Sequence, residues 1–240
     1  AACQRHYDTP QKGEPAVCLV TGKVEAPMRI HPSVKGVRGA QGTGAALVSF
    51  NANAFCSYGK TQNLNAPVSA YAAFAYTCAL NHLLADRNHT KFIGDTTVVY
   101  WSETGSSVYQ DAFSSLLFGG EETSDDMLDS LMRSLSRGDY ADYDGMSLDP
   151  NTTFYILGLS PNASRLSVRF FHRDTFGDLI RHMEQHYRDI DIVSDGRNKM
   201  TSLPLWLLLQ ETTNPKSQDK MSLPQLSGNM FSAIMDGTRY

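Results

Sequence analysis

The feature that most constrains the fold is a pair of strand-like segments joined by a short turn. Thr152–Leu159 and Ser164–His172 are rich in β-branched and aromatic residues, which favour strands. The link between them, Ser160-Pro161-Asn162-Ala163, contains residues that favour tight turns. The pattern therefore predicts a β-hairpin.

The second arm of this hairpin alternates strictly between two kinds of side chain. Successive side chains of a strand point to opposite faces of its sheet. One face is predicted to enter the core, and it carries Leu166, Val168, Phe170 and His172. The opposite face combines an arginine row with one aromatic residue, and it carries Arg165, Ser167, Arg169, Phe171 and Arg173.

Helical and strand patterns surround the hairpin. Apolar spacing predicts a helix from about Val68 to Ala85, with Asn65 as its cap, Pro67 in its first turn and Cys78 in the core. Ala45–Phe50 and part of Lys91–Trp101 are predicted strands. Further helices are predicted at Val108–Phe118, 175–190, Leu203–Gln210 and Leu223–Met235. We expect an α+β fold of mixed strands and helices, with a β-hairpin followed by helices.

Both ends of the 240-residue chain read as cuts in a longer sequence. It opens with Ala1-Ala2-Cys3 and closes with Arg239-Tyr240 soon after a helical pattern. We expect an internal piece of a larger multidomain subunit. No apolar run approaches the ~20 residues of a membrane span, and the four cysteines form no C-x-x-C pair. The prediction is a cytoplasmic protein without membrane contact.

Charge is unevenly distributed along the chain. Residues 1–60 hold seven Lys/Arg against three Asp/Glu, whereas residues 119–150 hold nine Asp/Glu against two arginines. We therefore divide the chain into a basic, Gly-rich α+β region (1–118), an acidic and variable segment (119–150) and a hairpin with helices (151–240). The net charge of −4 excludes a uniformly basic coat, but local basic patches still allow a polyanion to dock.

Catalytic motifs are weak. Ser57 and Lys60 match the S-x-x-K pattern of acyl-transferring serine enzymes, but no S-D-N or K-T-G partner follows. His182 and His186 have the spacing of helical metal ligands, yet a third ligand is not evident, so a surface helix is the simpler interpretation. We expect no catalytic residue, no metal and no cofactor.

Nucleic-acid contact is one chemistry that the remaining residues allow, although the residues alone indicate no more than an α+β domain with basic patches. Flexible Gly-rich backbone beside cations can hold phosphate, amides read base edges, and aromatics stack on bases. Structural roles remain open for each residue: turns for the glycine segment, capping for the amides, and salt bridges to the acidic segment for the arginines. The candidates are Lys35, Arg38, Gln41, Asn51, Asn53, Tyr58, Lys60, Gln62, Asn63, Arg165, Arg169 and Arg173.

A series of short strings carries a family resemblance. They occur in order as Cys18-Leu-Val-Thr-Gly22, Ile30-His31-Pro32, Gly39-Ala40-Gln41, Ser57-Tyr58-Gly59-Lys60, Asn65-Ala66-Pro67, Gly94-Asp95-Thr96-Thr97, Phe154-Tyr155-Ile156-Leu157 and Arg165-Leu166-Ser167-Val168-Arg169-Phe170. Together they resemble the Csd-type large subunit of type I-C CRISPR effector complexes, from about Cys18 to the end. The resemblance is weaker between Gly119 and Phe154.

The resemblance implies a non-catalytic subunit of an RNA-guided surveillance complex. Its implied partners are a crRNA, a repeated backbone subunit, a crRNA 5′-end-binding subunit, small subunits, target DNA and a helicase-nuclease. Its implied roles are recognition of double-stranded DNA and of the protospacer-adjacent motif, stabilisation of the R-loop and recruitment of the helicase-nuclease. The alternative is an interaction scaffold that contacts only protein subunits or guide RNA.

Overall fold

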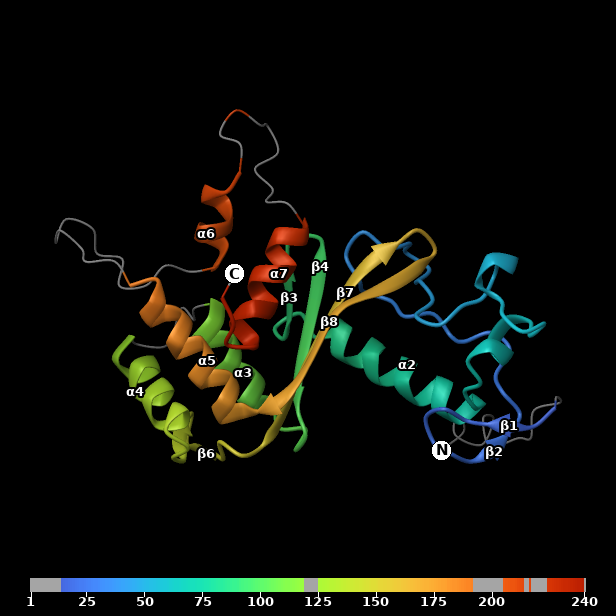
Figure 1. Cartoon of the computed structure of the whole chain (residues 1–240). Coiled ribbons are helices and arrows are strands. Elements are labelled where there is room, and N and C mark those ends of the chain that lie inside the picture. The colour runs from blue at the N-terminus through green and yellow to red at the C-terminus, as the bar shows by residue number, and fades with distance from the viewer. Residues whose placement is uncertain (1–13, 119–124, 192–204, 214–215, 217–223, 240) are drawn as a thin grey trace. The chain divides into compact units, whose positions relative to one another are not determined.

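The chain divides into two compact units. The computed structural model describes residues 14–118, 125–191, 205–213, 216 and 224–239 (Figure 1). Unit 1 comprises Ala1–Arg87 with Ser160–Ser167, and unit 2 comprises Asn88–Leu159 with Val168–Tyr240. The three segments expected from the sequence remain a prediction, as does the fragment status of the chain. Within the described ranges, no helix has the length and apolar character needed to cross a membrane.

Short strands and helices make up both units. Unit 1 contains β1 (Ala16–Val17), β2 (Val24–Glu25), η1 (Asn53–Phe55), η2 (Gln62–Asn65) and α2 (Ala70–Ala85). Unit 2 contains β3 (Thr90–Ile93), β4 (Thr96–Ser102), α3 (Ser107–Phe118), α4 (Asp125–Ser136), β5 (Ala141–Tyr143), β6 (Met146–Leu148), α5 (Phe176–Asp189), α6 (Leu205–Glu211) and α7 (Pro224–Met235). The predicted hairpin is present as β7 (Thr153–Asn162) and β8 (Arg165–Thr175), and the α+β fold class is confirmed.

A four-stranded sheet forms the centre of unit 2. Its order is β3-β4-β7-β8, and β4 pairs antiparallel with both β3 and β7. The predicted strand within Lys91–Trp101 is thus two strands, because Gly94 adopts a φ of 60° and turns the chain. Val98, Tyr100, Phe154 and Ile156 are fully buried in the core beside α3, α5 and α7.

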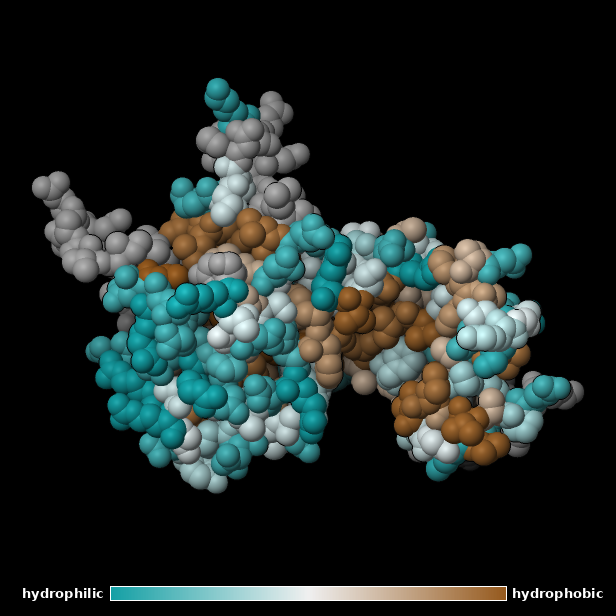
Figure 2. All heavy atoms as spheres, viewed as in Figure 1, coloured by the Kyte–Doolittle hydropathy of each residue, from teal (hydrophilic) through white to brown (hydrophobic). Residues whose placement is uncertain are grey.

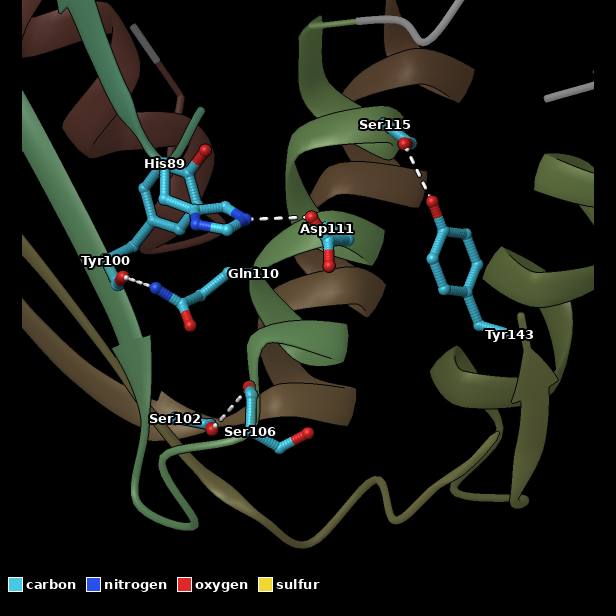
Figure 3. Close-up of polar contacts among 8 residues, drawn as sticks. All are labelled: His89, Tyr100, Ser102, Ser106, Gln110, Asp111, Ser115 and Tyr143. Carbon is cyan, nitrogen blue, oxygen red and sulfur yellow. Dashed lines mark hydrogen bonds and ion pairs between the residues drawn. The ribbon is translucent and has the colours of Figure 1, made fainter. Parts of the chain in front are cut away.

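Hydrogen bonds and an ion pair connect α3 to residues in or next to the sheet and in β5 (Figure 3). The Gln110 amide donates to the Tyr100 carbonyl at 3.0 Å, and the His89 ring lies 2.8 Å from the Asp111 carboxylate. The Ser115 hydroxyl meets the Tyr143 hydroxyl at 2.9 Å. Buried polar groups are costly unless they are hydrogen-bonded, so these contacts fix how α3 packs.

The acidic segment folds in part into the core of unit 2. Residues 119–124 lie outside the described residues, but α4 buries Leu131 and Leu135 and is followed by the β5–β6 hairpin. The acidic stretch after this helix therefore contains a strand pair. Asp144 and Gly145 form its tip, both with positive φ, as a two-residue hairpin turn requires.

Helix α2 starts later than predicted. Ser69, and not Asn65, caps it, since the Ser69 hydroxyl accepts a hydrogen bond from the Ala72 N–H at 3.3 Å. Its buried face includes Ala73, Leu80 and Leu84, whereas Cys78 is exposed and does not enter the core. The helix is apolar on nearly every side, so periodicity could not select the buried face.

Two strand expectations were wrong. Ala45–Phe50 forms no strand, only single bridges from Ala45 to Val34 and from Ala46 to Arg165. On β8, Leu166, Phe170 and His172 are buried as predicted, but Val168 is 52% exposed. Alternation determines the face of the sheet to which a side chain points. The side chain is buried only if another element packs over that position.

Candidate nucleic-acid interface

A pocket in unit 1 brings together four of the predicted site residues. It has a volume of about 630 Å³ and is lined in part by Asn51, Asn53, Gln62 and Asn63. The short helix η1 carries Asn53, and η2 carries Gln62 and Asn63, whereas Asn51 lies just before η1. Amides supply both donors and acceptors, so the pocket wall suits a ligand with mixed hydrogen-bonding edges.

Arg29 is the pocket residue that sequence reasoning missed. Its Nε donates to the Gln62 Oε1, and its side chain is exposed at the pocket wall. The sequence offered one indication of Arg29, because this residue directly precedes Ile30-His31-Pro32, one of the strings that carry the family resemblance. An arginine beside an amide gives the site a cationic donor that can bind a phosphate or a guanine edge.

Asn63 has a structural role in this site. It is buried, and its Nδ2 donates to the Met28 carbonyl at 3.0 Å. Asn65 has a similar role, donating to the Gln62 carbonyl at 2.8 Å and accepting from the Ser57 N–H at 2.8 Å. Both amides brace the loop, and Asn51, Asn53 and Gln62 are more accessible for ligand contact.

Tyr58 projects from the tip of the braced loop. Its side chain is 97% exposed, and both Tyr58 and Gly59 have positive φ values, 53° and 70°. The Lys60 N–H closes the turn on the Ser57 carbonyl at 3.0 Å. A positive φ is unfavourable for a bulky side chain. An exposed aromatic ring held in this conformation is typical of a contact residue.

The Gly-rich segment, residues 36–44, has clear structural requirements. Gly44 has a φ of 95°, and a Cβ there would lie 2.8 Å from the Val34 carbonyl oxygen. The Lys35 N–H is bound by Asn81 Oδ1 at 2.7 Å. Lys35, Arg38 and Gln41 are all exposed, so phosphate contact by this loop remains a prediction.

The three arginines of β8 have different environments. The Arg165 guanidinium lies 3.9 Å from the Phe55 ring in unit 1. In unit 2, Arg169 forms an ion pair with Asp95 at 3.1 Å, and Arg173 lies 6.0 Å from the Tyr155 ring. Asp95 lies in the β3–β4 turn and not in the acidic segment. The row is therefore not one uniform phosphate contact.

A Ser-His-Asp relay that the sequence did not reveal joins β8 to α7. The Ser232 hydroxyl lies 3.0 Å from His172 Nε2, and His172 Nδ1 lies 2.9 Å from the Asp236 carboxylate. Ser232 lies inside α7, and it is not among the lining residues of the 630 Å³ pocket in unit 1. The arrangement fits a polar clamp between helix and sheet.

The two histidines of α5 do not form a surface pair. His186 is buried, and burial lowers its pKa although Asp189 acts in the opposite direction. The Nδ1 atom of His182 forms a hydrogen bond with the Met235 carbonyl at 2.7 Å. The part of the chain that the structure describes has no cluster of three or more potential metal ligands.

The chain is an α+β protein with a pocket lined in part by amides, a braced loop that carries an exposed aromatic residue, and arginines in separate environments. The model of the CRISPR-associated protein family Cas_Csd1 matches residues 1–240. The chain therefore belongs to the Csd1 family of CRISPR-associated proteins. No curated protein matches it.

Proposed function

We propose that this chain is a non-catalytic large subunit of a type I-C RNA-guided effector complex in the cytoplasm. It contributes to recognition of target double-stranded DNA and of the protospacer-adjacent motif, stabilises the R-loop and recruits a helicase-nuclease. Its partners are the crRNA, the backbone subunit, the 5′-end-binding subunit and the small subunits. Membership of the Csd1 family supports a CRISPR role.

The observation that carries the DNA-binding proposal is the pocket in which Asn51, Asn53 and Gln62 adjoin Arg29. Amide and guanidinium groups are the side chains that best distinguish base edges, since each can bind an edge through two hydrogen bonds. Tyr58 stands on the neighbouring loop, where an aromatic ring can contact a base or sugar. Lys60 follows it and supplies positive charge for a phosphate.

Motif preference of the assembled complex tests this proposal. Asn51→Ala and Gln62→Ala should each reduce the preference for a duplex carrying the recognised motif over a scrambled duplex. A bidentate contact contributes about 1–3 kcal/mol of discrimination. Asn229→Ala is the matched control, because Asn229 is an exposed amide on α7 in unit 2. A preference ratio unchanged in both pocket variants would reject the pocket as the reader.

The non-catalytic role has its own test. Ser57 and Ser232 are the two serines with a nucleophile-like setting, in the S-x-x-K string and in the His172 relay. We expect Ser57→Ala and Ser232→Ala to leave target binding and target cleavage by the complete system unchanged. Loss of cleavage with retained binding would indicate an active site and contradict the proposal.

An interaction scaffold is the second candidate, and the β1–β2 region favours it. Val17, Leu19, Val20 and Val24 are all more than half exposed, and Figure 2 shows apolar residues gathered there, at the lower right. Exposed apolar clusters mark protein-binding surfaces. Val20→Asp should impair complex assembly if the scaffold role holds. Intact assembly with altered DNA affinity would argue against it.

A further inference from the structure

Three aromatic side chains form a continuous stack across the sheet of unit 2. The rings of Trp101 on β4 and Tyr155 on β7 are 5.3 Å apart with an interplanar angle of 13°. The rings of Tyr155 and Phe171 on β8 are 6.3 Å apart with an angle of 24°. Since β4, β7 and β8 are successive strands, the three rings make a single aromatic stack.

Strand alternation puts this stack on the face opposite the core. The preceding residues Tyr100, Phe154 and Phe170 are buried in the core of unit 2. Successive side chains point to opposite faces, so Trp101, Tyr155 and Phe171 lie on the other side of the sheet. The core does not require them, because it is filled by their neighbours.

The stack ends in solvent. Phe171 is 54% exposed and lies on β8, at one end of the strand order. Large aromatic rings on an edge strand invite unwanted association unless a ligand uses them. The free face of Phe171 is open to a further planar group, which would extend the stack by one layer.

Charge favours a nucleotide as that planar group. Arg173 lies 6.0 Å from the Tyr155 ring and forms no ion pair with any described residue. The Asp95 carboxylate in the β3–β4 turn is already bound by Arg169 at 3.1 Å. A flat ring beside a guanidinium that has no ion pair among the described residues provides base stacking and phosphate attraction together. A purely apolar protein surface would leave that cation buried without a partner.

We propose that the aromatic stack is a binding site for unpaired single-stranded DNA, with a base on Phe171 and a phosphate on Arg173. Bases in a duplex are already stacked on each other, so only an unpaired strand can use the ring. The inference rests on the proposed function, because opening of the target duplex supplies the unpaired strand.

Direct binding of oligonucleotides to the full-length protein tests the site. Phe171→Ala should weaken binding of fluorescent oligothymidylate by roughly 5- to 150-fold, the range for loss of one stacked base. Arg173→Ala should weaken it and reduce its salt dependence. Val168→Ala is the matched control, because Val168 is on the same strand and equally exposed at 52%, and it should bind like the unmodified protein.

Each other outcome has a distinct meaning. If Phe171→Ala binds oligothymidylate as the unmodified protein does, the site is overturned. If that variant also fails to assemble into the complex, Phe171 is a protein contact instead. Tighter binding of oligouridylate than of oligothymidylate would overturn the assignment to DNA. If Phe171→Ala loses single-strand binding while the pocket variants keep their motif preference, the proposed reader fails and the stacking site stands.

Discussion

At the scale of single residues, the environment of Cys18 lowers the pKa of its thiol. Burial raises the pKa of its thiol, but hydrogen bonds from the Thr21 side chain and from the backbone of Ser69, Thr21 and Val20 outweigh burial. Together they lower the pKa from 9.0 to about 6. The Ser69 N–H lies 3.3 Å from the sulfur.

This pKa predicts a pH effect on stability. The folded chain holds the thiol proton less tightly than the unfolded chain, so Cys18 should stabilise the fold above pH 9 and lose that effect as the pH falls to about 6. Thiolate ultraviolet absorbance should show an inflection near pH 6 that Cys18→Ser removes. An inflection only near pH 9 would contradict the hydrogen-bond network.

Tyr58 predicts a trade between stability and binding. Tyr58→Gly should stabilise the loop by up to about 1 kcal/mol, because glycine adopts a positive φ at little cost. The same change should weaken duplex binding by the complex, since the ring is lost. Ala163→Gly is the control, as Ala163 has a φ of 52° at the hairpin turn and no aromatic ring. Thermal unfolding and duplex affinity, measured together, separate the two effects, and unchanged duplex affinity would remove Tyr58 from the interface.

At the scale of elements, the start of α5 shows how local chemistry fixes a helix. The Thr175 hydroxyl donates to the Asp178 carboxylate at 2.7 Å and accepts from the Asp178 N–H at 3.2 Å. The Thr175 hydroxyl, followed by Arg181, lowers the pKa of Asp178 although burial opposes it. This reciprocal pair is a helix cap.

The cap gives a graded prediction. Thr175→Ala should destabilise the protein by about 1 kcal/mol. Because the Asp178 pKa is lowered in the folded state, its stabilisation should be present above the unfolded value of 3.8 and disappear as the pH falls further. Denaturant unfolding from pH 7 to pH 3 measures both effects. An equal loss from Thr175→Ser, which keeps the hydroxyl, would show that the cap is not the cause.

The elements also show what a sequence can and cannot predict. The hairpin and α5 were predictable, because turn residues and amphipathic spacing are local signals. The exposure of Val168 and Cys78 was not, since an apolar segment does not specify which neighbour covers it. The pocket contact between Arg29 and Gln62 joins residues 33 positions apart, and only the tertiary fold brings them together. The aromatic stack was missed for the same reason.

At the scale of the whole molecule, each unit contains a buried histidine whose pKa burial lowers. His31 lies in unit 1 with its Nδ1 2.7 Å from the Tyr76 hydroxyl, and His186 lies in unit 2. Both histidines favour the neutral form when folded. Unfolding should therefore become easier as the pH falls below ~6.5, the ordinary histidine value.

Hydrogen exchange can assign this acid sensitivity to each unit. His31→Gln should reduce the pH dependence of exchange in α2, and His186→Gln should reduce it in α5. Each variant serves as the control for the other unit. Parallel changes in both units after a single substitution would mean that the two units open as one.

The tip of the hairpin has a consequence for how the chain emerges from the ribosome. Residues 160–167 belong to unit 1, and there Ser164 and Leu166 bond the backbone of Ala46 at 3.2 and 2.9 Å. Unit 1 otherwise ends at Arg87. At ~5–20 residues per second, synthesis of the intervening stretch takes roughly 4–15 s. During that interval the Ala46 backbone lacks its hydrogen-bond partners Ser164 and Leu166. Unit 1 therefore cannot fold completely, and it remains accessible to chaperones, until much of unit 2 has been translated.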